Sequence, residues 1–286
     1  MRSEAQIKTL LLNMARADER IRAVLLNGSR VNAAIIKDEY QDFDVVFVVK
    51  ALEDFTSNHQ WIEVFGQTII TQLPDEMGIG QTSENSFGYL MLFSDGNRID
   101  LTLYPVNLIQ PNHWADSLTI CWLDKDALFT GLPQPTDADY LITAPTLNQF
   151  ADTCNEFWWV STYVVKGLAR QQIPYAKEMM ETVVRPQFMK MISWKIGTEN
   201  NFSVSFGKSG KFIRHFLGES FYQQLLTTYA DTGIEANWRA LIGMTELFTS
   251  LSTEVVSQLG FRLNWQEMRQ TQLYIKQRYE HYKLPD

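Results

Sequence analysis

Two aspartates stand at the start of a strongly apolar segment of the chain. Asp42 and Asp44 flank Phe43 and are followed by the apolar residues 45–49, a run that predicts a strand buried on both faces of a sheet. Because side chains alternate across a strand, residues two apart point the same way, so the two carboxylates are expected to converge. Two like charges held that close are unfavourable unless a cation lies between them. The spacing therefore predicts a metal site.

A third carboxylate is expected on a neighbouring strand. Residues 87–106 predict a β-hairpin, with two β-rich arms around a Ser-Asp-Gly-Asn turn. In the second arm, apolar residues alternate with Asp100 and Thr102, so Asp100 lies on the polar face. If this arm lies beside the first aspartate-bearing strand, Asp100 can join Asp42 and Asp44.

Each part of this constellation has a role in nucleotidyl transfer. The preceding strand ends at Gly28 and Ser29, where a glycine lets the backbone approach a phosphate and the following amides can donate to its oxygens. Asp42 and Asp44 are suited to hold Mg²⁺, which takes carboxylates together with substrate phosphates. Asp100 can accept a proton from the attacking hydroxyl or serve as a third metal ligand.

The elements that must position these residues can be predicted around them. A helix is expected over 4–17, a strand over 22–26, one helix over 51–66 that Gly66 ends, and a short strand over 68–73. Prolines recur in residues 131–146, where we place a domain boundary. Beyond this boundary the spacing of apolar residues predicts helices. The predicted domains are residues 1–135 and 146–286.

The helix with the strongest signal, over 146–172, carries a stripe of polar and aromatic side chains at spacings of three and four. Its members are Asp152, Glu156, Trp159, Tyr163, Lys166 and Arg170. The stripe can be a solvated face, with acids near the helix start and bases near its end as the helix dipole prefers. Alternatively it faces a ligand: Lys166 and Arg170 would reach a triphosphate, while the acidic and aromatic members bind a polycationic sugar. Lys208 can also touch phosphate, and an ordinary solvated loop explains it equally well.

Composition narrows the function classes. The chain has 286 residues, a formal net charge of −8, and hydrophobic and charged shares of 45% and 20%, which fit a globular protein of two domains. The negative charge disfavours a nucleic-acid binder and favours small or cationic partners. No apolar run approaches the ~20 residues of a membrane span, and the N-terminus lacks a signal peptide pattern. We expect a cytoplasmic protein with neither nucleic acid nor membrane as partner.

The same motifs carry a resemblance to a known family. The segments are GSR at 28–30, QDFD at 41–44, LFSDGNRIDLTLYP at 92–105 and CNEFWWVSTYVVKGLAR at 154–170. The overall pattern resembles the nucleotidyltransferase superfamily, and the last segment resembles more narrowly the aminoglycoside 6-adenylyltransferases that inactivate streptomycin.

This resemblance implies both a fold and an activity. The fold is α+β, with an N-terminal polymerase-beta-like nucleotidyltransferase domain built on a mixed sheet and an all-helical C-terminal domain that binds the acceptor. The activity is AMP transfer from ATP, with Mg²⁺, to an aminoglycoside hydroxyl. Gly28, Ser29, Arg30, Lys166 and Lys208 then contact the nucleotide. Asp152, Glu156, Trp159 and Tyr163 then contact the acceptor.

One alternative keeps the three aspartates and changes the acceptor. A nucleotidyltransferase of the same fold can modify a protein, as in AMPylation or antitoxin-type enzymes, or another small molecule. Such an enzyme would lack an acidic pocket for a sugar.

Overall fold

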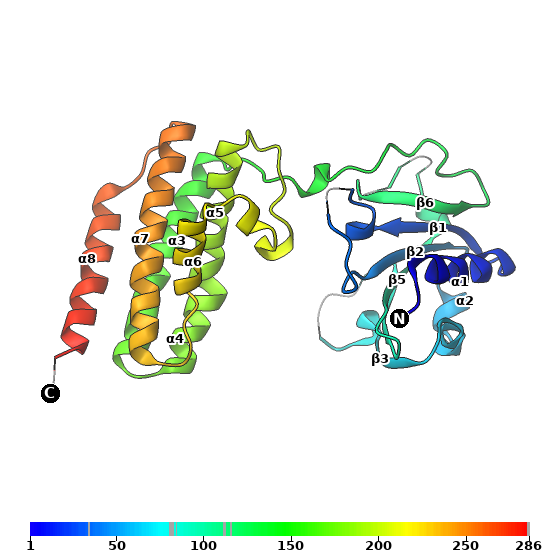
Figure 1. The fold of residues 1–286 in the computed structure, drawn as a ribbon, viewed down its shortest axis with the longest axis horizontal. Coiled ribbons are helices and arrows are strands. Elements are labelled where there is room, and N and C mark those ends of the chain that lie inside the picture. The colour runs from blue at the N-terminus through cyan, green and yellow to red at the C-terminus, as the bar shows by residue number, and fades with distance from the viewer. Residues whose placement is uncertain (34, 80–82, 84, 111–112, 115, 285–286) are drawn as a thin grey trace. The chain divides into compact units, whose positions relative to one another are not determined.

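The computed structural model describes residues 1–33, 35–79, 83, 85–110, 113–114 and 116–284. The chain divides into two compact units, which we call the sheet unit, Met1–Asp139, and the helical unit, Tyr140–Asp286 (Figure 1). The predicted α+β architecture is confirmed, since a mixed six-stranded sheet forms the first unit and helices form the second.

The sheet has the strand order β3-β4-β5-β2-β1-β6. Its strands are β1 Ile21–Asn27, β2 Phe43–Val49, β3 Thr68–Gln72, β4 Phe87–Phe93, β5 Arg98–Pro105 and β6 Thr119–Asp124. Neighbouring strands are antiparallel except β2 and β5, which run parallel. The hairpin of β4 and β5 and its position beside β2 agree with the prediction from sequence. The strand β6 was not predicted.

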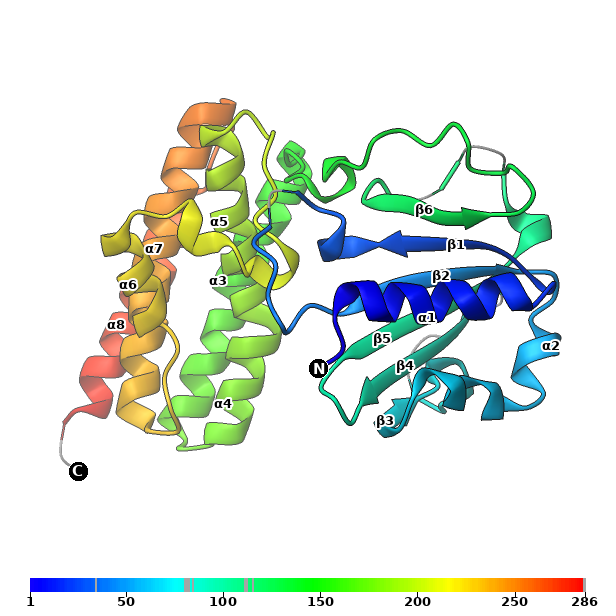
Figure 2. The same cartoon turned by 45° about the vertical axis from the view of Figure 1, so that its right-hand side comes forward.

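The helix α1, Glu4–Ala17, lies across one face of this sheet (Figure 2). It begins at Ser3, whose side chain accepts from the Gln6 amide in a capping box. Ile7, Leu11 and Ala15 recur at helical spacing and are fully buried against the apolar side chains of the strands. Burial of a side chain such as Leu11 contributes about 1.5–3 kcal/mol to the free energy of unfolding. This packing holds the central strands in place.

The segment 51–66 is not the single helix that the sequence predicts. It forms the short helix α2, Glu53–Thr56, and a separate 3-10 helix, His59–Phe65. Asn58 separates them because its backbone is extended, and its side chain caps the second helix by accepting from the Gln60 amide. Gly66 ends the segment with a φ of +120°, as predicted.

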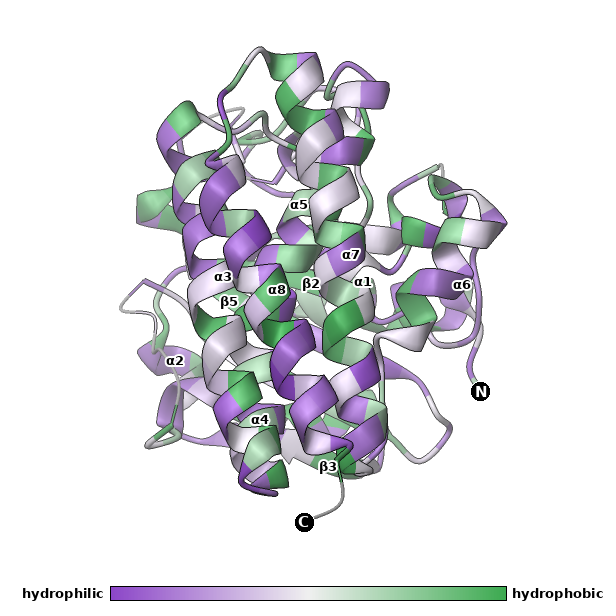
Figure 3. Ribbon diagram, turned by 90° about the vertical axis from the view of Figure 1, so that its left-hand side faces the viewer, coloured by the Kyte–Doolittle hydropathy of each residue, from purple (hydrophilic) through white to green (hydrophobic). Residues whose placement is uncertain are grey.

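The helical unit consists of six α-helices with short irregular connections among its described residues. They are α3 Leu147–Ala169, α4 Ile173–Met179, α5 Arg185–Glu199, α6 Glu219–Thr227, α7 Ile234–Leu259 and α8 Trp265–Tyr282, with a π-helical turn Met180–Val184 between α4 and α5. Figure 3 shows α8 between α3 and α7, and both neighbours contact it. Among the helices that the structure describes, none is both long and apolar enough to cross a bilayer.

Candidate active site

Asp44 lies where three strands bring polar groups into one row. It is the second residue of β2, and its register partners are Asn27 on β1 and Asp100 on β5. Burial, followed by the charges of Asp100 and Asp42, raises the pKa of the Asp44 carboxyl to about 6. The structure therefore brings the three predicted aspartates within electrostatic reach of one another.

Arg98 supplies the positive charge that faces these carboxylates. Its Nε and Nη2 each donate to Asp100, at 2.7 Å, and its Nη1 lies 3.7 Å from Oδ2 of Asp42. The paired Asp100 carboxylate raises the pKa of Arg98 above its usual range. Sequence reasoning missed this residue, although Arg98 and Asp100 are two apart on one strand and must share a face.

Gly28 follows β1 and borders the aspartates. Its φ of +77° lies in the left-handed region that favours glycine. A Cβ at this position would collide with the carboxylate oxygen Oδ2 of Asp44. Glycine therefore lets the Asp44 carboxylate approach the backbone at the end of β1.

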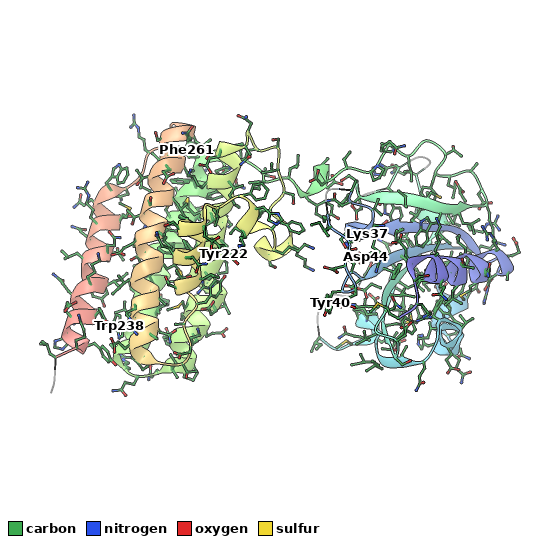
Figure 4. All side chains as sticks on the ribbon, viewed as in Figure 1. Lys37, Tyr40, Asp44, Tyr222, Trp238 and Phe261 are labelled. Carbon is green, nitrogen blue, oxygen red and sulfur yellow. The ribbon has the colours of Figure 1, made fainter. Side chains whose placement is uncertain are left out.

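Ser29 and Arg30 continue from Gly28 in a short 3-10 helix. The Ser29 hydroxyl accepts from the Gln41 side-chain amide at 3.4 Å. The Arg30 guanidinium donates to the backbone carbonyls of Gln41 and Asp42, at 2.6 and 2.9 Å, and lies over the Phe43 ring. Arg30 thus fixes the backbone that precedes β2. Lys37, Tyr40 and Asp44, labelled in Figure 4, lie at this end of the sheet unit.

The donor atoms of this site suit a hard cation, because carboxylate oxygens are the ligands that Mg²⁺ prefers. Across the described ranges, no three His, Cys, Asp or Glu side chains are already gathered in an arrangement that could hold a metal ion. Arg98 instead bridges Asp42 and Asp100. Burial and, after it, repulsion from Asp100 and Asp42 keep the pKa of Asp44 raised even with that guanidinium beside these carboxylates. A divalent cation would relieve this repulsion.

The predicted stripe lies along one side of α3 in the helical unit. Asp152, Glu156, Trp159, Lys166 and Arg170 are exposed, and Tyr163 is half-buried. Trp159 is 61% exposed, and its Nε1–H donates to the Tyr163 hydroxyl at 3.0 Å. The Lys166 ammonium lies 4.9 Å from the centroid of the Tyr163 ring.

The side of α3 opposite the stripe is buried, and Lys208, the other cation predicted to touch phosphate, is exposed. On the opposite side of α3 a second set of residues is buried, namely Phe150, Cys154, Phe157, Ser161, Val164 and Leu168. The outward direction of the stripe therefore agrees with either a solvated face or a ligand-facing one. Lys208 is exposed at the start of the 3-10 helix Lys208–Gly210, also in the helical unit.

Comparisons with known proteins agree with one another. The model of a family described as streptomycin adenylyltransferase matches residues 1–278. The chain is 42% identical to an aminoglycoside 6-adenylyltransferase of Campylobacter jejuni over 262 residues, which span 92% of this chain and 91% of that protein. It is 40% identical to one of Bacillus subtilis (strain 168) over 265 residues, or 92% and 93% of the two chains. A solved aminoglycoside 6-adenyltransferase from Bacillus subtilis aligns over 98% of this chain and 99% of that one, with 34% identity and a TM-score of 0.49.

Proposed function

The chain belongs to the streptomycin adenylyltransferase family, and from this premise we propose that it transfers AMP from ATP to a hydroxyl of an aminoglycoside such as streptomycin. The acceptor oxygen forms a bond to the α-phosphorus of ATP, the bond from that phosphorus to the β-phosphate oxygen breaks, and pyrophosphate leaves. The hydroxyl proton passes to a base.

Adenylylation of an aminoglycoside would confer antibiotic resistance. Because the co-substrate ATP is cytoplasmic, we place the enzyme there.

The observation that carries this proposal is the pairing of Asp44 with Asp100 on parallel strands, directly beside Gly28. Polar groups from β1, β2 and β5 meet there, and the backbone can come close to a phosphate because Gly28 has no side chain. This combination supports phosphoryl chemistry at this end of the sheet unit.

Asp42 and Asp44 are the proposed holders of Mg²⁺, with Asp100 as a third ligand or as the base. A bound Mg²⁺ would supply charge neutralisation for the phosphates. The all-carboxylate donor set and the mutual repulsion expressed in the pKa of Asp44 support this assignment. Arg98 would then release Asp42 and keep its bidentate hold on Asp100, whose carboxylate stays oriented along β5.

The nucleotide contacts are proposed on both units of the chain. Gly28 and Ser29 offer backbone and hydroxyl groups at the end of β1, while Arg30 acts through its hold on the Gln41 and Asp42 carbonyls. In the helical unit, Lys166 and Lys208 are exposed cations that we assign to phosphate. We correspondingly assign residues 1–135 to nucleotidyl transfer and 146–286 to acceptor binding.

The acceptor contacts are proposed along the α3 stripe. Asp152 and Glu156 carry the negative charge that an aminoglycoside ammonium group requires, and Trp159 with Tyr163 offers aromatic surface for stacking against a sugar. Trp159 is 61% exposed, so its ring is accessible for such stacking.

The test is turnover with a defined set of acceptors. The protein is incubated with ATP, Mg²⁺ and each of several aminoglycosides, and both released pyrophosphate and adenylylated acceptor are quantified. We expect equal amounts of the two products with at least one aminoglycoside, and none with the variant Asp44→Asn. Pyrophosphate release without any modified aminoglycoside, or with AMP attached to protein, would contradict the proposal.

A further inference from the structure

A cationic depression lies on the helical unit between α3 and α8, and we call it the α3–α8 pocket. Its volume is about 450 Å³, which is in the range of small-molecule sites. Its polar lining comes from both helices and comprises Thr162, Tyr163, Lys166, Arg170, Tyr274 and Arg278. The pocket involves side chains of α8 that sequence reasoning did not single out.

Three of the lining residues are cations, and none is an acid. Lys166 lies in the last turn of α3, Arg170 is the C-cap residue of that helix, and Arg278 approaches from α8. Within the part of the chain that the structure describes, no salt bridge joins any of the three to a carboxylate. By contrast Lys276, on the same helix α8, is paired with Glu246 at 2.8 Å. The positive charge of the pocket is therefore left uncompensated in a protein of net charge −8.

Aromatic rings hold two of these cations in position. Lys166 lies 4.9 Å from the Tyr163 ring centroid, and Arg278 lies 5.3 Å from that of Tyr274, which precedes it by one turn. Cation–π contacts of this kind keep the cationic groups near the apolar surface without neutralising them. The Tyr163 hydroxyl already accepts from Trp159, so its own proton remains available to a ligand oxygen.

We propose that the α3–α8 pocket binds the diphosphate group of a small anion, either the polyphosphate end of the nucleotide or the released pyrophosphate. Three cations and a tyrosine hydroxyl match the several charged oxygens of a diphosphate. A nucleic acid would require a longer basic track, which the net charge and the size of the pocket disfavour. The assignment rests on the proposed function, because ATP and pyrophosphate are that reaction's substrate and product.

The experiment measures binding without catalysis. The full chain is titrated with pyrophosphate and separately with ATP by calorimetry, in EDTA and without acceptor. Under these conditions the aspartates of the sheet unit repel the anion, so that binding reports on the cationic residues. In Arg278→Gln we expect the Kd of pyrophosphate to rise about tenfold, because a charge-assisted contact is lost. Arg170→Gln should act in the same direction.

The matched control is Arg269→Gln, which removes the same charge from an exposed position of α8 outside the pocket. We expect this control to leave the Kd unchanged and all variants to retain the wild-type melting temperature. Weakened ATP binding in Arg278→Gln identifies the nucleotide as the source of the diphosphate, and weakened pyrophosphate binding alone identifies the product. Equal Kd values in wild type, Arg278→Gln and Arg170→Gln, or no binding by wild type, would overturn the proposal. Neither of these results depends on whether an aminoglycoside is modified.

Discussion

Asp44 on β2 lies directly opposite Asp100 on the parallel strand β5. Two carboxylates in register on adjacent strands repel each other, and this repulsion adds to the burial that raises the pKa of Asp44 to about 6. The folded protein therefore carries an electrostatic cost at its candidate site when no metal is bound.

This cost predicts a pH-dependent gain in stability for Asp44→Asn. The folded-state pKa of about 6 exceeds the unfolded value of 3.8, so the wild-type free energy of unfolding falls as pH rises through this window. In EDTA, we expect Asn to raise the free energy of unfolding by about 2 kcal/mol at pH 7 and by little at pH 4. Urea denaturation at both pH values measures the difference.

The control for this prediction is Glu39→Gln, which removes a carboxylate from an exposed position. It should leave the free energy of unfolding within about 0.5 kcal/mol of wild type at both pH values. A gain for Asp44→Asn that is as large at pH 4 as at pH 7 would show that electrostatic repulsion is not its cause.

Gly28→Ala should damage the site while leaving most of the fold intact. The new Cβ would meet Oδ2 of Asp44, and alanine would be strained at a φ of +77°. We expect a loss of about 1–2 kcal/mol in the free energy of unfolding and a fall of kcat by more than about tenfold, because the displaced Asp44 carboxylate no longer holds the metal where the substrate needs it. Gly78→Ala is the control, since a Cβ there meets nothing within 4 Å. Normal turnover in Gly28→Ala would exclude a close approach at this position.

Glu156→Gln tests the α3 stripe as an acceptor site. Losing a charge partner of a bound ammonium group should raise the KM for the aminoglycoside about tenfold and leave the KM for ATP nearly unchanged. Glu178→Gln makes the same change at an exposed position of α4 and should alter neither constant. If the KM for the aminoglycoside stays constant in both variants, the stripe is a solvated face.

The sheet and its aspartates could be predicted because their sequence signals are local. The apolar strand β2 and the alternation in β5 each require only a few consecutive residues, and both agree with the structure. The edge strand β6 is different: its apolar run, residues 120–123, has only four residues, and periodicity cannot distinguish so short a run in a strand from one in a buried helix.

Other features depend on local capping or on tertiary contacts, neither of which hydrophobic periodicity encodes. The helical pattern of residues 51–66 was correct in type, but Asn58 interrupts it with a cap that competes with a continuous helix. In the sequence, the spacing of Tyr274 and Arg278 is typical of an ordinary exposed helix face. Only their packing beside Lys166 and Arg170 gathers the cations into a pocket.

The last prediction separates the two roles proposed for Asp100. Its carboxylate accepts two hydrogen bonds from Arg98, which fix its orientation on the polar face of β5. A sugar hydroxyl is a poor nucleophile at neutral pH, and a well-placed base accelerates its attack by about 10²–10⁴-fold. If Asp100 is the base, Asp100→Asn should lose turnover by this factor and retain the wild-type Kd for ATP with Mg²⁺, because the metal ligands Asp42 and Asp44 remain.

If Asp100 is mainly a metal ligand, the same variant should bind ATP with Mg²⁺ more weakly, and a higher Mg²⁺ concentration should partly restore the rate. We favour the base, because Mg²⁺ usually takes one or two protein carboxylates and completes its shell with phosphate and water. Calorimetry of Asp100→Asn with ATP and Mg²⁺ decides between the roles: an unchanged Kd with lost turnover identifies the base, and a raised Kd rejects it.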